Sequence, residues 1–331
     1  MAKKPRPRPR TPKRRVPPTL DSHVPPLQGV PQHPKGSLII IGGNETKDGH
    51  KPILEEVASR VGRGKLVIAT FASNEPREQW EQYRNVFRSI GVKRVEHLDA
   101  RTRDELIATP QLEVVEGANV LFFAGGDQLK ITSLFGGTPL CEAIRKRYSA
   151  GATIAGTSSG AAVMSETMLV AGNGGESHTS GESLRMAPGL GFIPGVIIDQ
   201  HFAERGRIGR LLGAVAQNPR LLGIGIDEDT AVAFDGHRKF QVLGTGAVYV
   251  IDGRNVLYTD VAEDAGDTTS IHGLMLHVLA TADSFDLVDR VPIAPPPKAK
   301  QRAQDQQRQQ REKQHKEEQH KEEQQQEAAG Q

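Results

Sequence analysis

Short apolar segments alternate with longer amphipathic ones through the middle of the chain. The apolar segments carry hydrophobic residues at consecutive positions, which is typical of strands buried on both faces. The predicted strands are residues 37–41, 65–69, 94–98, 118–123 and 152–155. The amphipathic segments repeat apolar residues at helical spacing. The predicted helices are residues 51–63, 76–90, 102–107 and 139–148. This alternation predicts an α/β fold with a mostly parallel sheet flanked by helices.

Apolar segments continue beyond residue 190. Residues 195–199 and 221–227 are two further predicted strands. The segments 231–234, 239–243 and 247–251 are predicted to form hairpins at the edge of the sheet.

Glycine-rich turns follow three of the predicted strands, at residues 42–43, 125–126 and 156–160. Parallel sheets bind ligands at the carboxyl ends of their strands. We therefore expect the functional site where these three turns converge.

The two ends of the chain lack the apolar pattern. Residues 1–36 are rich in Pro, Lys and Arg, and the chain beyond Pro297 is mostly Gln, Lys, Glu, Arg and Ala. We expect one catalytic domain over residues 37–290, a disordered basic arm before it and a low-complexity tail over residues 291–331. The composition of the arm favours a solubilising role, so we expect no nucleic-acid partner.

The composition narrows the class of protein further. The 331-residue chain has one cysteine, Cys141, which excludes an internal disulfide and fits a reducing cytoplasm. No segment approaches the ~20 apolar residues of a membrane span, and the arm lacks the apolar core of a secretion signal. No cluster of His, Cys or acidic residues has metal-ligand spacing, so we expect no metal and no cofactor.

The segment Gly156-Thr157-Ser158-Ser159-Gly160 carries the strongest chemical signal. It places Gly-x-Ser-x-Gly between a predicted strand and helix-forming residues, the context of a nucleophile elbow. In such a turn Ser158 is exposed for attack on a carbonyl carbon, and the N–H of Ser159 can donate to the developing oxyanion. Ser159 is the rival hydroxyl, but it lies off the apex.

A serine nucleophile needs a base and an acid that orients it. His201 follows the predicted strand 195–199 and is expected to open a helix. Glu228 follows the predicted strand 221–227, with Asp227 as the neighbouring rival. Three arginines after His201 form either a solvated helix face or a cationic wall for a substrate carboxylate.

Four segments together resemble the cyanophycinase family, whose larger serine-peptidase family includes the aspartyl dipeptidases called peptidase E. The segments are Gly125–Gln128 (GGDQ), Gly156–Ala161 (GTSSGA), Asp199–Arg210 (beginning DQHF) and Gly223–Glu228 (GIGIDE). The resemblance runs from about Ser37 to Asp289. It implies a fold akin to class I glutamine amidotransferases, a homodimer, and hydrolysis of cyanophycin to β-Asp-Arg dipeptides. Cyanophycin is a poly-aspartate chain that bears arginine on each side-chain carboxylate. The lack of a secretion signal makes the cytoplasm the expected location.

The resemblance also implies roles for particular residues. Ser158 would be the nucleophile, His201 the base and Glu228 the third triad member, with the N–H groups of Gly126 and Ser159 as oxyanion donors. The implied substrate-pocket residues are Gln128, Asp199, Gln200, Arg205, Arg207 and Arg210. The family more often has Ala at position 159.

Three alternatives remain open from the sequence. In the peptidase E pattern the acid lies between Ser and His, which points to Glu176 or Glu182. The substrate could then be an aspartyl or isoaspartyl dipeptide rather than the polymer. A different class is a non-catalytic binding protein that acts through its tails. An α/β-hydrolase esterase is disfavoured, because its His usually lies far downstream of the Ser, whereas Ser158 and His201 are only 43 residues apart.

Overall fold

The computed structural model describes residues 36–171, 184–236, 238–260 and 270–295, together with residues 297, 305, 308 and 309. The helices in these ranges are α1 (Pro52–Val61), α2 (Pro76–Ile90), α3 (Arg103–Ile107), α4 (Thr109–Val115), α5 (Gln128–Phe135), α6 (Pro139–Ser149), α7 (Ser159–Ala162) and α8 (Ile208–Gln217). The first strands are β1 (Ser37–Ile41), β2 (Lys65–Ala69), β3 (Val95–Leu98), β4 (Ala118–Phe123), β5 (Thr153–Thr157), β6 (Thr167–Ala171), β7 (Arg185–Pro188), β8 (Val196–Gln200) and β9 (Leu222–Ile226). The later strands are β10 (Thr230–Asp235), β11 (Lys239–Gly244), β12 (Val248–Asp252), β13 (Tyr258–Thr259), β14 (Ile271–His272), β15 (Met275–Leu279), β16 (Ser284–Asp286) and β17 (Val291–Ile293).

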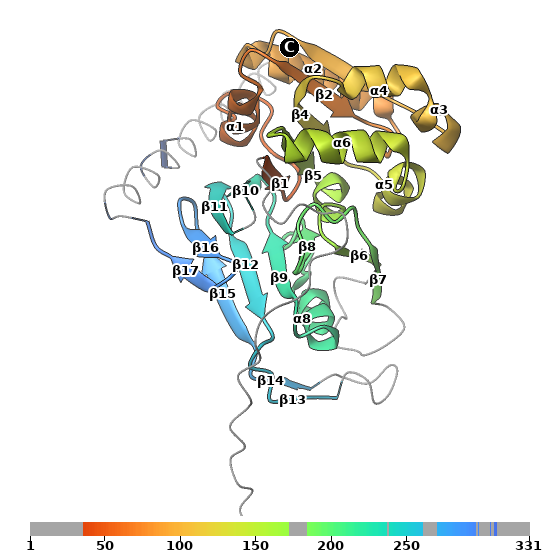
Figure 1. The fold of residues 1–331 in the computed structure, drawn as a ribbon. Helices are drawn as coiled ribbons and strands as arrows, with labels where there is room; N and C mark the ends of the chain where they lie inside the picture. The colour runs from red at the N-terminus through yellow and green to blue at the C-terminus, as the bar shows by residue number, and fades with distance from the viewer. Residues whose placement is uncertain are drawn as a thin grey trace, which may run out of the picture.

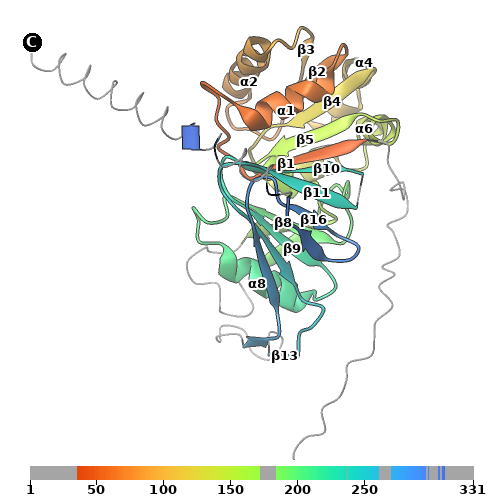
Figure 2. The same cartoon turned by 90° about the vertical axis from the view of Figure 1, so that its left-hand side faces the viewer.

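A nine-stranded sheet forms the centre of the molecule, with strand order β17-β16-β11-β10-β1-β5-β4-β2-β3. Figure 2 shows the strands from β3 to β11 stacked in this order. Strands β1 to β5 pair in parallel, whereas β10, β11, β16 and β17 extend the sheet in antiparallel fashion. The predicted α/β class is confirmed, although the sheet is mixed.

Both faces of the central sheet are covered, which is why its strands are apolar throughout. On β1, Ile39 and Ile41 pack into the core formed with α1 and α2. Their neighbours Leu38 and Ile40 pack into the core on the other face, which α5 and α6 help to form. Because successive side chains of a strand point to opposite faces, a strand with a core on each side needs apolar residues at consecutive positions.

A second sheet, in the order β15-β12-β9-β8, lies below strands β1, β2, β4 and β5 of the first in Figure 1. Strands β8 and β9 are parallel, and β12 and β15 run antiparallel to their neighbours. Ile198 and Ile224 share a core with the central sheet, whereas Ile197 and Ile251 pack on α8. The second sheet therefore lies between the first sheet and α8.

Several predicted strands are present but pair with other strands, or lie in another sheet, than expected. The segment 231–234 does not lie at an edge, because β10 pairs directly with β1. The strands at 195–199, 221–227 and 247–251 belong to the second sheet. Apolar periodicity reports burial of a strand, but strand pairing depends on residues distant in the chain.

Other differences concern element boundaries. The helix expected to open at His201 begins at Ile208, after consecutive turns that include Gly206 at φ 58°. Strand β17 extends the sheet to Ile293, beyond the expected boundary at residue 290. The short or partly exposed elements α4, α5, β6, β7 and β13 to β17 have no prediction, because their apolar periodicity is weak.

Candidate active site

Ser158 lies at a sharp turn between β5 and α7. Its backbone has φ 55°, a left-handed value that is strained for a residue with a side chain. A Cβ atom at Gly156 would overlap the carbonyl oxygen of Gly160, and one at Gly160 would overlap that of Phe123. The predicted elbow is therefore present, and its two glycines are required by close backbone approach.

A chain of hydrogen bonds joins Ser158, His201 and Glu228. The Ser158 Oγ lies 2.9 Å from the His201 Nε2, and the His201 Nδ1 lies 2.6 Å from the Glu228 Oε1. The Asn44 Nδ2 donates to the other Glu228 oxygen at 2.8 Å. The rival Asp227 instead accepts the backbone N–H groups of Ala203 and Ala247, so its carboxylate holds the turn after β8.

The Gly42-Gly43 turn at the end of β1 fixes the position of His201. The His201 N–H donates to the Gly42 carbonyl at 2.8 Å, and the backbone of His201 has φ 48°. A Cβ atom at Gly43 would overlap the His201 ring. The same turn accepts the N–H of Asp229, next to Glu228, at 2.9 Å. One glycine turn thus places the base and the acid beside the elbow.

The electrostatic surroundings keep His201 neutral and Glu228 ionised. Burial lowers the pKa of His201 below its ordinary value; the hydrogen bond to Glu228 opposes this, and the charges of Arg205 and Arg207 reinforce it. Burial alone would raise the pKa of Glu228, but hydrogen bonds from His201 and Asn44 outweigh it and leave that pKa below its ordinary value. A neutral imidazole next to a carboxylate is the state in which a base accepts the serine proton.

The expected oxyanion donors lie at the elbow, but one has a partner already. The Gly126 N–H donates to the Ser159 Oγ at 2.6 Å, and the Ser159 hydroxyl donates to the Gly126 carbonyl at 2.7 Å. Gly126 has φ 152°, and a Cβ atom there would overlap the Ala72 carbonyl oxygen. The hydroxyl of Ser159 therefore holds the loop after β4 in place. It also accepts the Gly126 N–H, which is one of the two donors expected to stabilise the oxyanion.

The residues expected to line the substrate pocket are mostly paired with one another. Asp199, 1% exposed, accepts hydrogen bonds from Arg210, which is 6% exposed, and from Arg207. Arg207 also donates to the side-chain and backbone oxygens of Gln200, and burial beside these groups lowers its pKa to about 10. Arg205 is exposed.

Gln128, the first residue of α5, lies apart from this network. Its Nε2 donates to the backbone carbonyl of Leu169 on β6 at 2.8 Å. Its side chain therefore ties α5 to the hairpin formed by β6 and β7.

A pocket of about 390 Å³ opens over the triad. Ser158, His201 and Glu228 line it together with residues that have no counterpart among the sequence predictions. These are Asn44, Lys47, Gln79, Gln82, Tyr83 and Thr157. The Gly-Gly turn was a signal for Asn44, which follows it directly, but nothing in the pattern of α2 marks Gln79 or Gln82 as part of a site.

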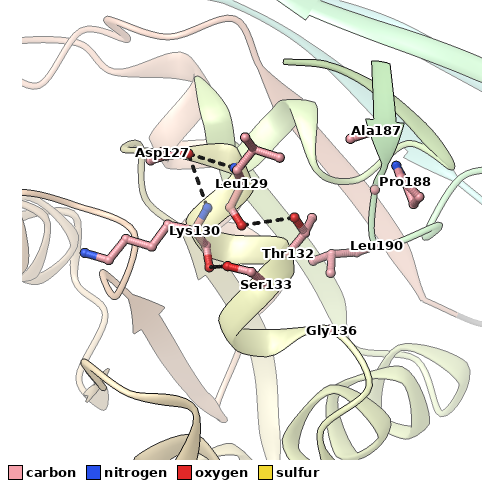
Figure 3. Close-up of a pocket in the computed structure, with 10 residues that line it drawn as sticks. Asp127, Leu129, Lys130, Thr132, Ser133, Gly136, Ala187, Pro188 and Leu190 are labelled. Atoms are coloured by element: carbon pink, nitrogen blue, oxygen red, sulfur yellow. Dashed lines mark hydrogen bonds between the residues drawn. The ribbon is translucent and has the colours of Figure 1, made fainter. Parts of the chain in front are cut away.

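A larger groove of about 710 Å³ lies between α5 and the end of β7, and none of the triad residues lines it. Figure 3 shows the Asp127 carboxylate turned back onto the first N–H groups of α5, those of Leu129 and Lys130. Asp127 is thus a helix cap, and the smaller pocket is the one that contains the chemistry.

Some sequence predictions fall on other parts of the chain. The alternative acids Glu176 and Glu182 lie outside the described residues. Cys141 is buried, as expected for a packing residue. Within the described ranges, no three acidic, His or Cys side chains are grouped to hold a metal ion. No helix among the same residues is long and apolar enough to span a bilayer.

Comparisons with known proteins identify relatives of this chain. The model of peptidase family S51 matches residues 38–242. A cyanophycinase from Trichormus variabilis is 41% identical over 266 residues, covering 79% of this chain and 89% of that protein. A cyanophycinase from Geminocystis herdmanii is 39% identical over 267 residues, covering 80% of this chain and 98% of that protein.

One solved structure supports the fold. The peptidase from an acI-B1 Actinobacterium superposes with a TM-score of 0.57 at 23% identity, over 76% of this chain and 97% of that one. The family match covers more than half of the chain and contains the elbow, His201 and Glu228. The chain therefore belongs to peptidase family S51, and the prediction that it is a peptidase is confirmed.

Proposed function

We propose that this protein is a serine-type exopeptidase that hydrolyses cyanophycin to β-Asp-Arg dipeptides. The observation that carries the proposal is the hydrogen-bonded Ser158–His201–Glu228 chain in an S51 peptidase. The relatives with 38–41% identity that bear the name cyanophycinase support this substrate over a free dipeptide.

The proposed reaction has two steps. The Ser158 Oγ attacks an aspartyl carbonyl carbon of the polymer backbone while the His201 Nε2 takes its proton, since these atoms are 2.9 Å apart. His201 then protonates the leaving amine, the C–N bond breaks, and an acyl-enzyme remains. Water attacks the ester with His201 again as base, and the acid is released as Ser158 regains its proton. Glu228 holds the imidazole tautomer and stabilises its cationic form.

The oxyanion of each tetrahedral intermediate needs N–H donors. We assign this role to the N–H groups of Ser159 and Gly126. The Gly126 N–H contributes when it is released from, or shared with, the Ser159 hydroxyl that holds it in the resting enzyme.

The residues around Asp199 are proposed to support the substrate side of the site. Arg205 is exposed, and Arg207 is half-buried beside Gln200. Asp199 fixes the direction of Arg207 through an ion pair, and Arg210 holds Asp199 through a second one. Gln128 is proposed to line the substrate side of the site as well.

The proposed assembly is a homodimer in the cytoplasm. Exposed apolar side chains on β15, namely Met275, Leu276 and Val278, favour a partner surface on the second sheet. The dimer is tested by sedimentation velocity of the full chain, and a purely monomeric species would contradict it.

The direct test is hydrolysis of purified cyanophycin by the full-length protein, with products identified by mass. We expect β-Asp-Arg as the main product from wild type, and a loss on the order of a thousandfold or more in Ser158→Ala. Ser89→Ala is the matched control, because it removes an exposed hydroxyl on α2 that bonds only its own helix. A folded wild-type protein that releases aspartate from Asp-X dipeptides but leaves the polymer intact would replace this proposal with a peptidase E-like activity.

A further inference from the structure

The pocket over Ser158 has a second polar wall opposite the residues expected from sequence. Asn44 and Lys47 come from the segment after β1, and Gln79 and Gln82 come from α2. Lys47 is the one Lys or Arg among the described residues that line this pocket. The arginines at 205, 207 and 210 do not line it, so an anion that enters the pocket meets the ammonium group of Lys47 first.

The ammonium of Lys47 is held in a fixed position. Its Nζ lies 3.2 Å from both the backbone oxygen and the Oε1 of Glu45, and 5.1 Å from the centre of the Tyr83 ring. An ammonium group has three N–H donors; one of them donates to the Glu45 backbone oxygen, and the charge is paired with the Glu45 carboxylate. The Lys47 side chain is 20% exposed, so a further donor is available to a ligand in the pocket.

The same buried carboxylate ties Lys47 to the nucleophile. Glu45 is 2% exposed and accepts the Tyr83 hydroxyl at 2.5 Å and the Thr157 Oγ1 at 2.6 Å. Thr157 precedes Ser158 directly, so one carboxylate sets the position of both the elbow and the ammonium. A cation at a fixed distance from the attacking oxygen can select substrates by where they carry a negative charge.

The amide of Gln79 adds a complementary group. Its Oε1 is buried and has no hydrogen-bond partner among the described residues. A buried acceptor without a donor is costly, and a ligand N–H relieves that cost when the terminal amide turns toward it. The wall therefore offers a donor to a carboxylate and an acceptor to a nearby N–H, a pair that matches an amino acid with a free carboxylate.

We propose that Lys47 binds the α-carboxylate of the arginine in the Asp-Arg unit whose aspartyl carbonyl is attacked. The assignment rests on the proposed function. In cyanophycin each arginine is joined through its α-amino group, so its α-carboxylate is free and lies a few bonds from the scissile carbonyl. Lys47 is thus a specificity-determining residue, and it selects β-arginylated aspartate over a plain aspartyl chain.

The test compares two substrates with the full-length enzyme. One is a short β-Asp-Arg oligomer with free arginine carboxylates, and the other is the same oligomer with arginine carboxamides. We expect wild type to prefer the carboxylate oligomer by about tenfold or more in kcat/KM, the range of one charge-assisted contact. Lys47→Gln reduces this preference to about one, mainly by raising KM for the carboxylate oligomer, whereas Lys47→Arg keeps a preference because it keeps a cation.

Lys130→Gln, on the separate groove beside α5, is the matched control and leaves the preference unchanged. Absence of a preference in wild type overturns the assignment, whatever the stability of the variants. Equal losses on both oligomers in Lys47→Gln overturn it as well, because they show a structural role through Glu45. A wild-type enzyme that cleaves neither oligomer nor cyanophycin overturns the proposed function itself, an outcome distinct from the first two.

Discussion

At the scale of residues, the site stores backbone strain at Ser158 and His201, the proposed nucleophile and base. Ser158 and His201 both have left-handed backbones, at φ 55° and 48°. Each such residue costs about 1–3 kcal/mol. The strain is held by hydrogen bonds from the Ser158 N–H to the Ile41 carbonyl and from the His201 N–H to the Gly42 carbonyl. Both acceptors belong to the end of β1, so one strand end orients the nucleophile and its base.

Ser159→Ala should raise kcat by about threefold to tenfold. The substitution removes the hydroxyl that accepts the Gly126 N–H. This N–H can then bind the oxyanion without first giving up another hydrogen bond, which lowers the barrier by about 1 kcal/mol. Steady-state kinetics on soluble cyanophycin oligomers measure the change. A fall in kcat would mean instead that the hydroxyl is needed to hold the Gly125-Gly126 loop.

The activity should stay high on the acidic side of neutrality. The reaction needs neutral His201, and burial together with Arg205 and Arg207 lowers its pKa, so the midpoint of the acidic limb of kcat/KM lies below the ordinary histidine value of 6.5. Arg205→Gln removes one cation, raises the pKa of His201 and moves the acidic limb to higher pH. The pH profiles of kcat/KM for wild type and variant test this. An acidic limb that stays in place, or that moves to lower pH in the variant, would contradict it.

At the scale of elements, the turn after β1 joins the two sheets. Gly42 donates to the Thr230 carbonyl and accepts from His201, and Gly43 accepts from Asp229. Thr230 begins β10 in the central sheet, whereas His201 directly follows β8 in the second. The carboxyl ends of β1, β5, β8 and β9 therefore meet at one turn, and a side chain at Gly43 would separate them.

Gly43→Ala should lower kcat by about a hundredfold or more while most of the fold remains. A Cβ atom there overlaps the His201 ring and breaks the 2.9 Å contact with Ser158. Gly49→Ala is the control, because it also has positive φ, at 60°, but no atom lies within 4 Å of its Cβ position. Equal losses in the two variants would show that backbone strain, rather than the displaced base, causes the effect.

Asp199→Asn should destabilise the fold by about 3–5 kcal/mol, because it leaves Arg210 buried without its carboxylate. The ion pair joins β8 to α8, so its loss loosens the support of the second sheet. Chemical denaturation of wild type and variant at pH 7 gives the difference in free energy of unfolding. A variant of unchanged stability would show that Arg210 finds another acceptor.

At the scale of the whole molecule, the site is assembled from two sheets that share a core. Ser158 follows β5 of the central sheet, and His201 and Glu228 follow β8 and β9 of the second. Figure 1 shows the second sheet and α8 below the parallel strands of the central one. Every residue assigned to the triad and its pocket lies within residues 36–295.

Removal of residues 1–35 and 296–331 together should leave kcat on soluble oligomers within about twofold of the full chain, because no assigned residue belongs to either segment. The same pair of proteins is then compared on insoluble cyanophycin. A large loss on the soluble oligomers would contradict the assignment of the whole site to residues 36–295.

The sequence by itself determined the elements that carry the chemistry. Consecutive apolar residues predicted β1, β2 and β4, because these strands are buried on both faces. The elbow could be predicted because Gly156, Ser158 and Gly160 are local requirements of one turn. The tertiary structure decided which strands pair, that Arg207 and Arg210 share Asp199 as an ion-pair partner, and that Lys47 and Gln79 line the pocket over Ser158. These contacts join residues far apart in the chain, and a local pattern records the burial of a side chain but not the partner that buries it.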